Sequence, residues 1–463
     1  MKTKQLKLSK LILLFILLGI GQFTIAQLGY SSASMAMGRM GSNSGMIPTP
    51  DQVIVEEYFN YHKHQLTAPE EDQPIAIDIN SYVSADNSTI LQVGLNTGFI
   101  KNMDNIPPVN VCLVIDRSGS MQGDRIEKAR EAAVEFVKRL REKDIVSVVL
   151  FDDQIDVLLP AQHATDKAKL IAAIRTIEVR GSTDLNGGLI QGYSEVMKNY
   201  DNGQNNKVIM LTDAIANTGV VDPLQIIKGS DAYKTEYEID ITMVGIGVDF
   251  NNTLSRKISN NNSSSIFFVN DAEDIKKVFI DEIESLLSPV ARDVKLHIAI
   301  SSEFEIEKCF GYMPKMHNNE IVMDLENMNS GLTQVILIKL KNKRGRELSY
   351  GDITAKLAYF DIAKQTNETL SESNSSKKNQ SDVEKNYTIA RMAQCIKDMS
   401  ILAKAKDYSE AKYRVDYILE STLTSYPKME DADIKRVYDI LSKYKETLSQ
   451  FATDDAATLS FPY

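Results

Sequence analysis

The chain has 463 residues, with 52 Lys and Arg against 63 Asp and Glu, and its formal charge at pH 7 is −11. This length exceeds one ordinary domain and predicts roughly two to four. Nucleic acid is excluded as an expected partner, because binding a phosphate backbone depends on cationic neutralisation that an acidic chain does not supply.

Residues 1–26 have the three parts of a signal peptide. Four lysines and no acidic residue precede or border the apolar run Leu11–Ile20, and the segment ends at Ala26. The run is too short for a membrane helix, which needs about 20 apolar residues. We therefore expect an exported chain, periplasmic or at the cell surface or extracellular, whose mature form begins at Gln27 and has no integral membrane span.

The segments that flank the centre of the chain differ in pattern. Residues 27–50 are rich in Gly, Ser and Met and predict a disordered linker. Residues 51–108, an N-terminal segment followed by alternating apolar and polar positions, share that alternation with residues 288–363 and predict one β-sandwich with an insertion between its halves. Residues 364–386 are polar and predict a second linker, whereas residues 387–463 predict a small C-terminal helical region.

Residues 109–287 alternate short apolar runs with helical patterns. The apolar runs predict strands at 109–115, 145–151, 207–211, 239–246 and 266–269. Helical spacing predicts helices at 126–140, 166–177, 185–199 and 271–287. Continuous apolar runs are typical of parallel strands that are covered on both faces, so this segment predicts a doubly wound, Rossmann-like α/β domain inserted in the β-sandwich.

Five oxygen-bearing side chains follow or approach the ends of these strands. They are Asp116, Ser118, Ser120, Thr183 and Asp213. We expect them to converge, because ligands of open parallel sheets bind beyond the carboxyl ends of the strands. Hard oxygen donors without thiolate or imidazole suit Mg²⁺, or Ca²⁺ or Mn²⁺, and with two carboxylates the ion can still accept a carboxylate from outside. The alternative is a structural loop without a bound ion.

The same residues resemble a known site. Asp-x-Ser-x-Ser at 116–120, Gly-Ser-Thr-Asp around Thr183 and Leu-Thr-Asp ending at Asp213 look like the metal ion-dependent adhesion site (MIDAS) of von Willebrand factor A (VWA) domains. The resemblance covers about residues 109–287. It implies direct metal bonds from the three hydroxyls, with the two aspartates acting directly or through water. It also implies that an acidic side chain of a partner protein completes the metal shell.

The flanks widen the resemblance. Residues 55–79 and the helical tail are similar to those of bacterial exported VWA proteins with a characteristic N-terminal segment. One position departs from the pattern: Ala214 follows the last motif Asp, where the family often has Gly.

These patterns predict a metal-dependent protein-binding module for adhesion or assembly, with no catalytic and no organic cofactor-binding residues. A structural scaffold that binds through the β-sandwich or the helical tail is one alternative. A metal-assisted hydrolase is another, although the sequence has no Gly-x-Ser-x-Gly, His-Glu-x-x-His or Gly-x-x-x-x-Gly-Lys motif and no Cys with a plausible His partner. Three cysteines permit at most one disulfide.

Overall fold

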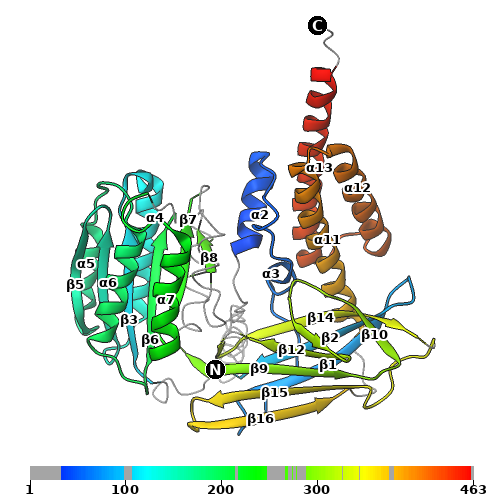
Figure 1. Ribbon diagram of the computed structural model, residues 1–463, viewed down its shortest axis with the longest axis horizontal. Coiled ribbons are helices and arrows are strands. Elements are labelled where there is room, and N and C mark those ends of the chain that lie inside the picture. Colours follow the sequence, from blue (N-terminus) through cyan, green and yellow to red (C-terminus); the bar gives the residue numbers. More distant parts are fainter. Residues whose placement is uncertain are drawn as a thin grey trace, which may run out of the picture.

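The protein consists of an α/β domain, a β-sandwich and a group of C-terminal helices (Figure 1). This architecture confirms the predicted fold class. The computed structural model describes residues 33–98, 107–213, 217–247, 266–269, 274, 278, 288–325, 327–343, 345–374 and 380–459. The predicted signal peptide at 1–26 lies outside these residues. Within them, no helix is long and apolar enough to cross a membrane.

A six-stranded sheet forms the centre of the α/β domain, in the order β5-β4-β3-β6-β7-β8. Its strands are β3 (Val109–Asp116), β4 (Ile145–Phe151), β5 (Ile155–His163), β6 (Asn205–Thr212), β7 (Asp240–Ile246) and β8 (Ile266–Val269). Neighbouring strands are parallel except β4 and β5. The five predicted strands are present. The sequence analysis did not predict β5, a partly exposed edge strand whose short apolar run Val157–Leu159 is followed by Pro160.

Helices cover both faces of this sheet. They are α4 (Asp124–Arg139), α5 (Lys167–Arg175), α6 (Leu185–Met197) and α7 (Pro223–Tyr237). Leu113 and Ile115 of β3 pack in the core that contains α4 and α5, whereas Cys112 and Val114 pack in the core that contains α6 and α7. Burial on both faces explains why the strands are continuous apolar runs. The sequence missed α7, and most of the predicted helix at 271–287 lies outside the described residues.

Two antiparallel sheets form the β-sandwich, in the orders β1-β2-β14-β10 and β11-β12-β9-β15-β16, with β13 beside β9. The strands are β1 (Ile75–Val83), β2 (Thr89–Thr97), β9 (Pro289–Ile300), β10 (Phe304–Cys309), β11 (Lys315–His317), β12 (Glu320–Asp324), β13 (Met328–Asn329), β14 (Thr333–Asn342), β15 (Ile353–Asp361) and β16 (Thr366–Ser373). Strand β2 precedes the α/β domain and pairs with β14, which follows it. The α/β domain is therefore inserted in the sandwich.

The C-terminal helices pack on the outer surface of one sandwich sheet. They are α11 (Gln380–Lys404), α12 (Tyr408–Ser425) and α13 (Ala432–Leu459), and the short helix α3 (Val55–Phe59) joins them. Strand β14 contributes side chains to two hydrophobic cores. Ile336 and Ile338 face the sandwich interior, whereas Val335 and Leu337 face the helices. The helical tail therefore shares a core with the sandwich.

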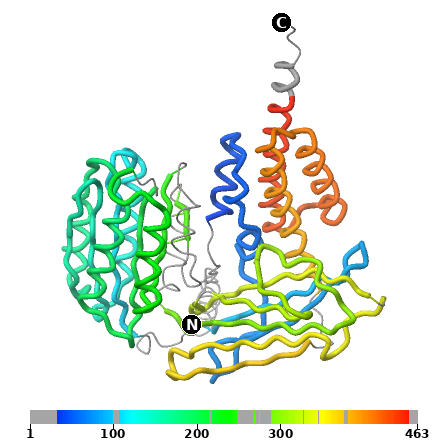
Figure 2. The backbone as a smooth tube through the Cα atoms, viewed as in Figure 1, coloured from blue at the N-terminus to red at the C-terminus, as the bar shows by residue number. Residues whose placement is uncertain are grey.

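Two segments differ from their predicted role as linkers. Residues 27–50 include helix α2 (Ala33–Ser44), and residues 364–386 include β16 and the start of α11. Helix α2 lies between the α/β domain and α13 (Figures 1 and 2). Its Gly, Ser and Asn residues lower its helix propensity, so packing on both sides contributes more to its stability than local preference does. Composition alone therefore could not identify it.

Candidate metal centre

Asp116 ends β3 at the carboxyl edge of the sheet, and its side chain is fully buried. Its Oδ1 accepts a hydrogen bond from the backbone N–H of Ser118 at 2.9 Å, and its Oδ2 accepts one from the Thr212 hydroxyl at 2.6 Å. Both donors are neutral. Among the described residues no cation pairs with this carboxylate, although a buried carboxylate is costly without one.

Of the two serines of the motif, Ser118 is the N-cap of the short 3₁₀ helix η2 (Gly119–Met121) and Ser120 lies within that helix. The hydroxyls of Ser118 and Ser120 are 3.1 Å apart. Ser118 is buried and Ser120 is exposed. The pair therefore connects the buried Asp116 to the surface of the domain.

Thr183 reaches the same place from the loop before α6. The backbone N–H of Gly119 donates to the carbonyl of Gly181 at 2.9 Å, which ties this loop to the first motif. The backbone N–H of Thr183 donates to Asn217 Oδ1 at 2.7 Å. The Thr183 hydroxyl, in contrast, is buried and has no hydrogen-bond partner among the described residues. A buried hydroxyl oxygen without a hydrogen-bond partner in the described fold is typical of a ligand site.

Asp213 follows β6 and is also fully buried. Its Oδ2 is 3.3 Å from Nη1 of Arg125, a residue in the first turn of α4. The same Nη1 donates to the backbone oxygen of Ser120 at 3.1 Å. Arg125 thus connects the Asp213 segment with the serine loop.

Electrostatics at this edge favour a cation. Burial raises the pKa of Asp116 to about 6; the hydrogen bonds from Thr212 and Ser118 lower the pKa, and the nearby Asp213 carboxylate raises it. A divalent cation would stabilise the charged form of both carboxylates. Carboxylate and hydroxyl oxygens are the donors that such hard cations prefer. The residues present therefore fit a divalent metal ion.

The structure places all five predicted side chains at one edge of the sheet, on three loops that backbone hydrogen bonds join. Metal ligation by these residues remains a prediction. The sequence interpretation missed Arg125, Thr212 and Asn217, which hold or neutralise the donors. Thr212 lies within the Leu-Thr-Asp motif, and the sequence signal for Arg125 and Asn217 was their position near the motifs. Ala214, the departure from the family pattern, lies outside the described residues.

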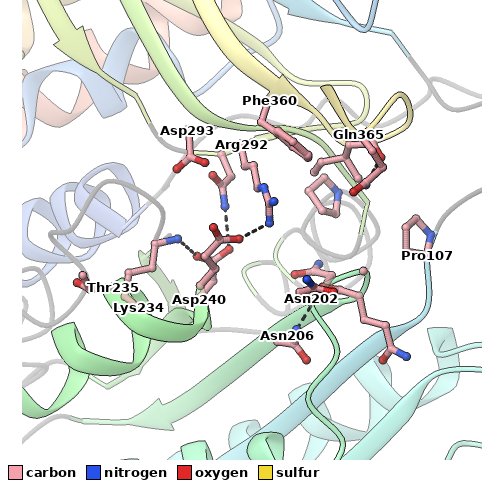
Figure 3. A pocket seen from close by; sticks show the side chains of 17 residues that line it. Pro107, Asn202, Asn206, Lys234, Thr235, Asp240, Arg292, Asp293, Phe360 and Gln365 are labelled. Atoms are coloured by element: carbon pink, nitrogen blue, oxygen red, sulfur yellow. Dashed lines mark hydrogen bonds and ion pairs between the residues drawn. The ribbon is translucent and has the colours of Figure 1, made fainter. Parts of the chain in front are cut away.

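A second polar region lies at the opposite end of the sheet. Here a cavity of about 500 Å³ separates the α/β domain from the sandwich, and we call it the joint pocket (Figure 3). Asp240 pairs with Lys234 at 2.5 Å and accepts a hydrogen bond from Asn327 at 2.9 Å. Arg292 pairs with Glu238 across the same gap. The Asp240–Asn327 and Arg292–Glu238 contacts join the two domains, whereas the Asp240–Lys234 pair lies within the α/β domain.

Comparison with known proteins identifies the class. Residues 110–280 match the family model of the von Willebrand factor type A domain, and the chain therefore contains a VWA domain. Domains of this type are typically protein-interaction or adhesion modules.

Individual relatives extend the similarity beyond that domain. The uncharacterized protein YfbK of Escherichia coli (strain K12) is 26% identical over 366 residues, which are 72% of this chain and 63% of that protein. Inter-alpha-trypsin inhibitor heavy chain H1 of Sus scrofa is 29% identical over 197 residues, 40% of this chain and 22% of the relative. The chain thus spans less than two thirds of either relative. Neither name denotes an enzyme.

A solved structure supports the fold. The von Willebrand factor type A protein from Catenulispora acidiphila superposes with a TM-score of 0.53 at 15% identity, over 78% of this chain and 89% of that one. At this identity the likeness concerns the fold alone. It covers more of this chain than the VWA domain does.

Proposed function

We propose that this chain is an exported, metal-dependent protein-binding module. Mg²⁺, or Ca²⁺ or Mn²⁺, binds at the five donors of the candidate metal centre, and an acidic side chain of a partner protein completes its coordination. The observation that carries this proposal is the buried Asp116 carboxylate without a cationic partner among the described residues, next to the orphan hydroxyl of Thr183.

Each group has a defined part in the proposed site. The hydroxyls of Ser118, Ser120 and Thr183 provide neutral donors, and the two aspartates provide charge that nearly neutralises a dication. Because the proposed donor set contains two anionic groups, the bound ion remains able to attract a carboxylate. Thr212 and Asn217 position Asp116 and Thr183 through the hydrogen bonds at 2.6 Å and 2.7 Å. Partner affinity would reside in this carboxylate and in the surrounding loops.

The test is capture of partner proteins on the immobilised chain in excess Mg²⁺ or in EDTA. We expect capture in Mg²⁺, its loss in EDTA, and its loss in Asp116→Ala. Thr183→Val is the matched variant, because it replaces an unbonded hydroxyl by a methyl of similar shape and leaves the fold unchanged. Capture that persists in EDTA and in both variants would contradict the proposal.

The scaffold alternative has one observation in its favour. The outer face of α12 carries two exposed tyrosines one turn apart, Tyr413 and Tyr417, which are 67% and 61% exposed. Deleting the helical tail would open the core that it shares with β14, so the double variant Tyr413→Ala, Tyr417→Ala is the sharper experiment. Loss of partner capture in this variant, with Mg²⁺ affinity unchanged, would favour the scaffold.

A further inference from the structure

Arg125 brings a positive charge to the proposed metal centre. Its Nη1 is 3.3 Å from the buried Asp213 Oδ2 and 3.1 Å from the Ser120 backbone oxygen. The Arg125 side chain is 21% exposed. The guanidinium therefore lies where the charge of a bound divalent ion would act, and it shares a carboxylate with the proposed donor set.

The neighbouring strand end leaves room for this side chain. Gly247 follows β7 with φ of +86°, and a Cβ built there would lie 2.4 Å from Arg125 Nε. Any larger residue at 247 would displace the arginine as well as strain the backbone. The contact between Arg125 and Gly247 is independent of the hydrogen bonds to Asp213 and Ser120. Two observations thus place the guanidinium beside the metal centre.

We propose that Arg125 is an internal competitor of the metal ion: its guanidinium is a counter-charge of Asp213 in the metal-free protein and lowers the affinity of the site for a divalent cation. The inference rests on the proposed function, since it concerns the same site. A buried carboxylate is stabilised by a paired cation. A guanidinium and a dication that share this carboxylate repel each other, so binding of the metal weakens the ion pair.

This arrangement has two consequences. The metal-free domain stays folded, because Asp213 retains a cationic partner without metal. The metal binds more weakly than it would bind to the same donors if Arg125 were absent. The occupancy of the metal site therefore changes with the concentration of the cation around the protein. Arg125 is in this sense a residue that sets metal affinity and not a ligand.

The experiment uses the mature chain and MgCl₂ alone as the probe. Isothermal titration of Arg125→Ala should show Mg²⁺ binding about tenfold tighter than in the unaltered chain, a difference of about 1.4 kcal/mol. Arg125→Lys, which keeps the charge, should bind Mg²⁺ like the unaltered chain. Arg130→Ala is the matched control, because Arg130 lies on the same helix and pairs with Glu127. It should leave Mg²⁺ affinity unchanged.

Thermal unfolding gives a second readout. In EDTA the melting temperature of Arg125→Ala should fall by a few degrees, and saturating Mg²⁺ should raise it by more than in the unaltered chain. If this variant does not fold in EDTA, Arg125→Gln retains the hydrogen-bonding stem without the charge and allows the same comparison.

The outcomes separate this inference from the proposed function. Mg²⁺ affinity that is unchanged or weaker in both Arg125→Ala and Arg125→Gln, while the unaltered chain binds Mg²⁺, overturns the role of Arg125 alone. No Mg²⁺ binding to the unaltered chain or to either variant overturns both proposals. Binding to the charge-removed variants but not to the unaltered chain supports competition by Arg125.

Discussion

The two ends of the VWA sheet both contain buried aspartates, but the surroundings of these aspartates differ. At the joint pocket Asp240 has two partners, Lys234 from α7 and the amide of Asn327 from the segment just before β13. At the carboxyl edge Asp116 has only neutral donors, and the Thr183 hydroxyl has no partner among the described residues. Satisfied charges are typical of a structural contact, whereas unsatisfied oxygens indicate a ligand site.

Asp240→Ala should produce the largest change in stability. It leaves Lys234, which is 22% exposed, without its carboxylate and removes the hydrogen bond from Asn327. We expect a loss of about 3 kcal/mol in the free energy of unfolding, measured by urea denaturation. Mg²⁺ affinity should not change, because Asp240 begins β7 at the opposite end of the sheet. If the variant instead changed Mg²⁺ affinity and left the free energy of unfolding unchanged, Asp240 would belong to a ligand site and not to a structural contact.

Thr183→Val should have a smaller effect of opposite sign. Removing a buried hydroxyl without a partner should stabilise the metal-free protein by about 1 kcal/mol. Mg²⁺ affinity should fall, and calorimetric titration together with denaturation in EDTA measures both effects. A destabilised metal-free variant would mean that the hydroxyl is already satisfied in the fold.

Arg292→Ala should destabilise the protein by about as much as Thr183→Val stabilises it, but without the accompanying change in Mg²⁺ affinity. Its ion pair with Glu238 is partly exposed, and its guanidinium lies 4.3 Å from the centre of the Phe360 ring. Exposed ion pairs and cation–π contacts each contribute about 0.5–1 kcal/mol. We expect a loss of about 1 kcal/mol by urea denaturation, with unchanged Mg²⁺ affinity. A loss as large as that of Asp240→Ala would show that the joint depends on this pair.

The sequence predicted those features that depend on local pattern. Parallel strands buried on both faces are continuous apolar runs, and Asp116 and Asp213 stand at the ends of two of them. Their convergence follows from the geometry of a parallel sheet. The same pattern could not reveal Arg125, since a cation in the first turn of an amphipathic helix ordinarily faces solvent. Its contact with Asp213 depends on how the start of α4 approaches the segment that follows β6.

Sequence pattern failed where distant packing determines the structure. Residues 33–44 contain no apolar period, yet they form α2 because neighbours from two domains surround them. Strand β16 has the polar sequence TNETLSES and is an edge strand that pairs only with β15 among the described strands. Backbone hydrogen bonds stabilise such a strand, and these bonds cannot be recognised from the amino-acid composition because every residue type except proline can form them.

Helix α2 also belongs to two hydrophobic cores of the chain at once. Met37 packs in the VWA core, whereas Met35 packs in the core of the C-terminal helices, and the Tyr444 hydroxyl donates to the Gly38 carbonyl at 3.0 Å. Two cores that share one helix lose contacts together when it detaches. We therefore expect cleavage of the backbone between α2 and α3 to make the unfolding of these two cores less cooperative, which calorimetry would show as more widely separated melting transitions.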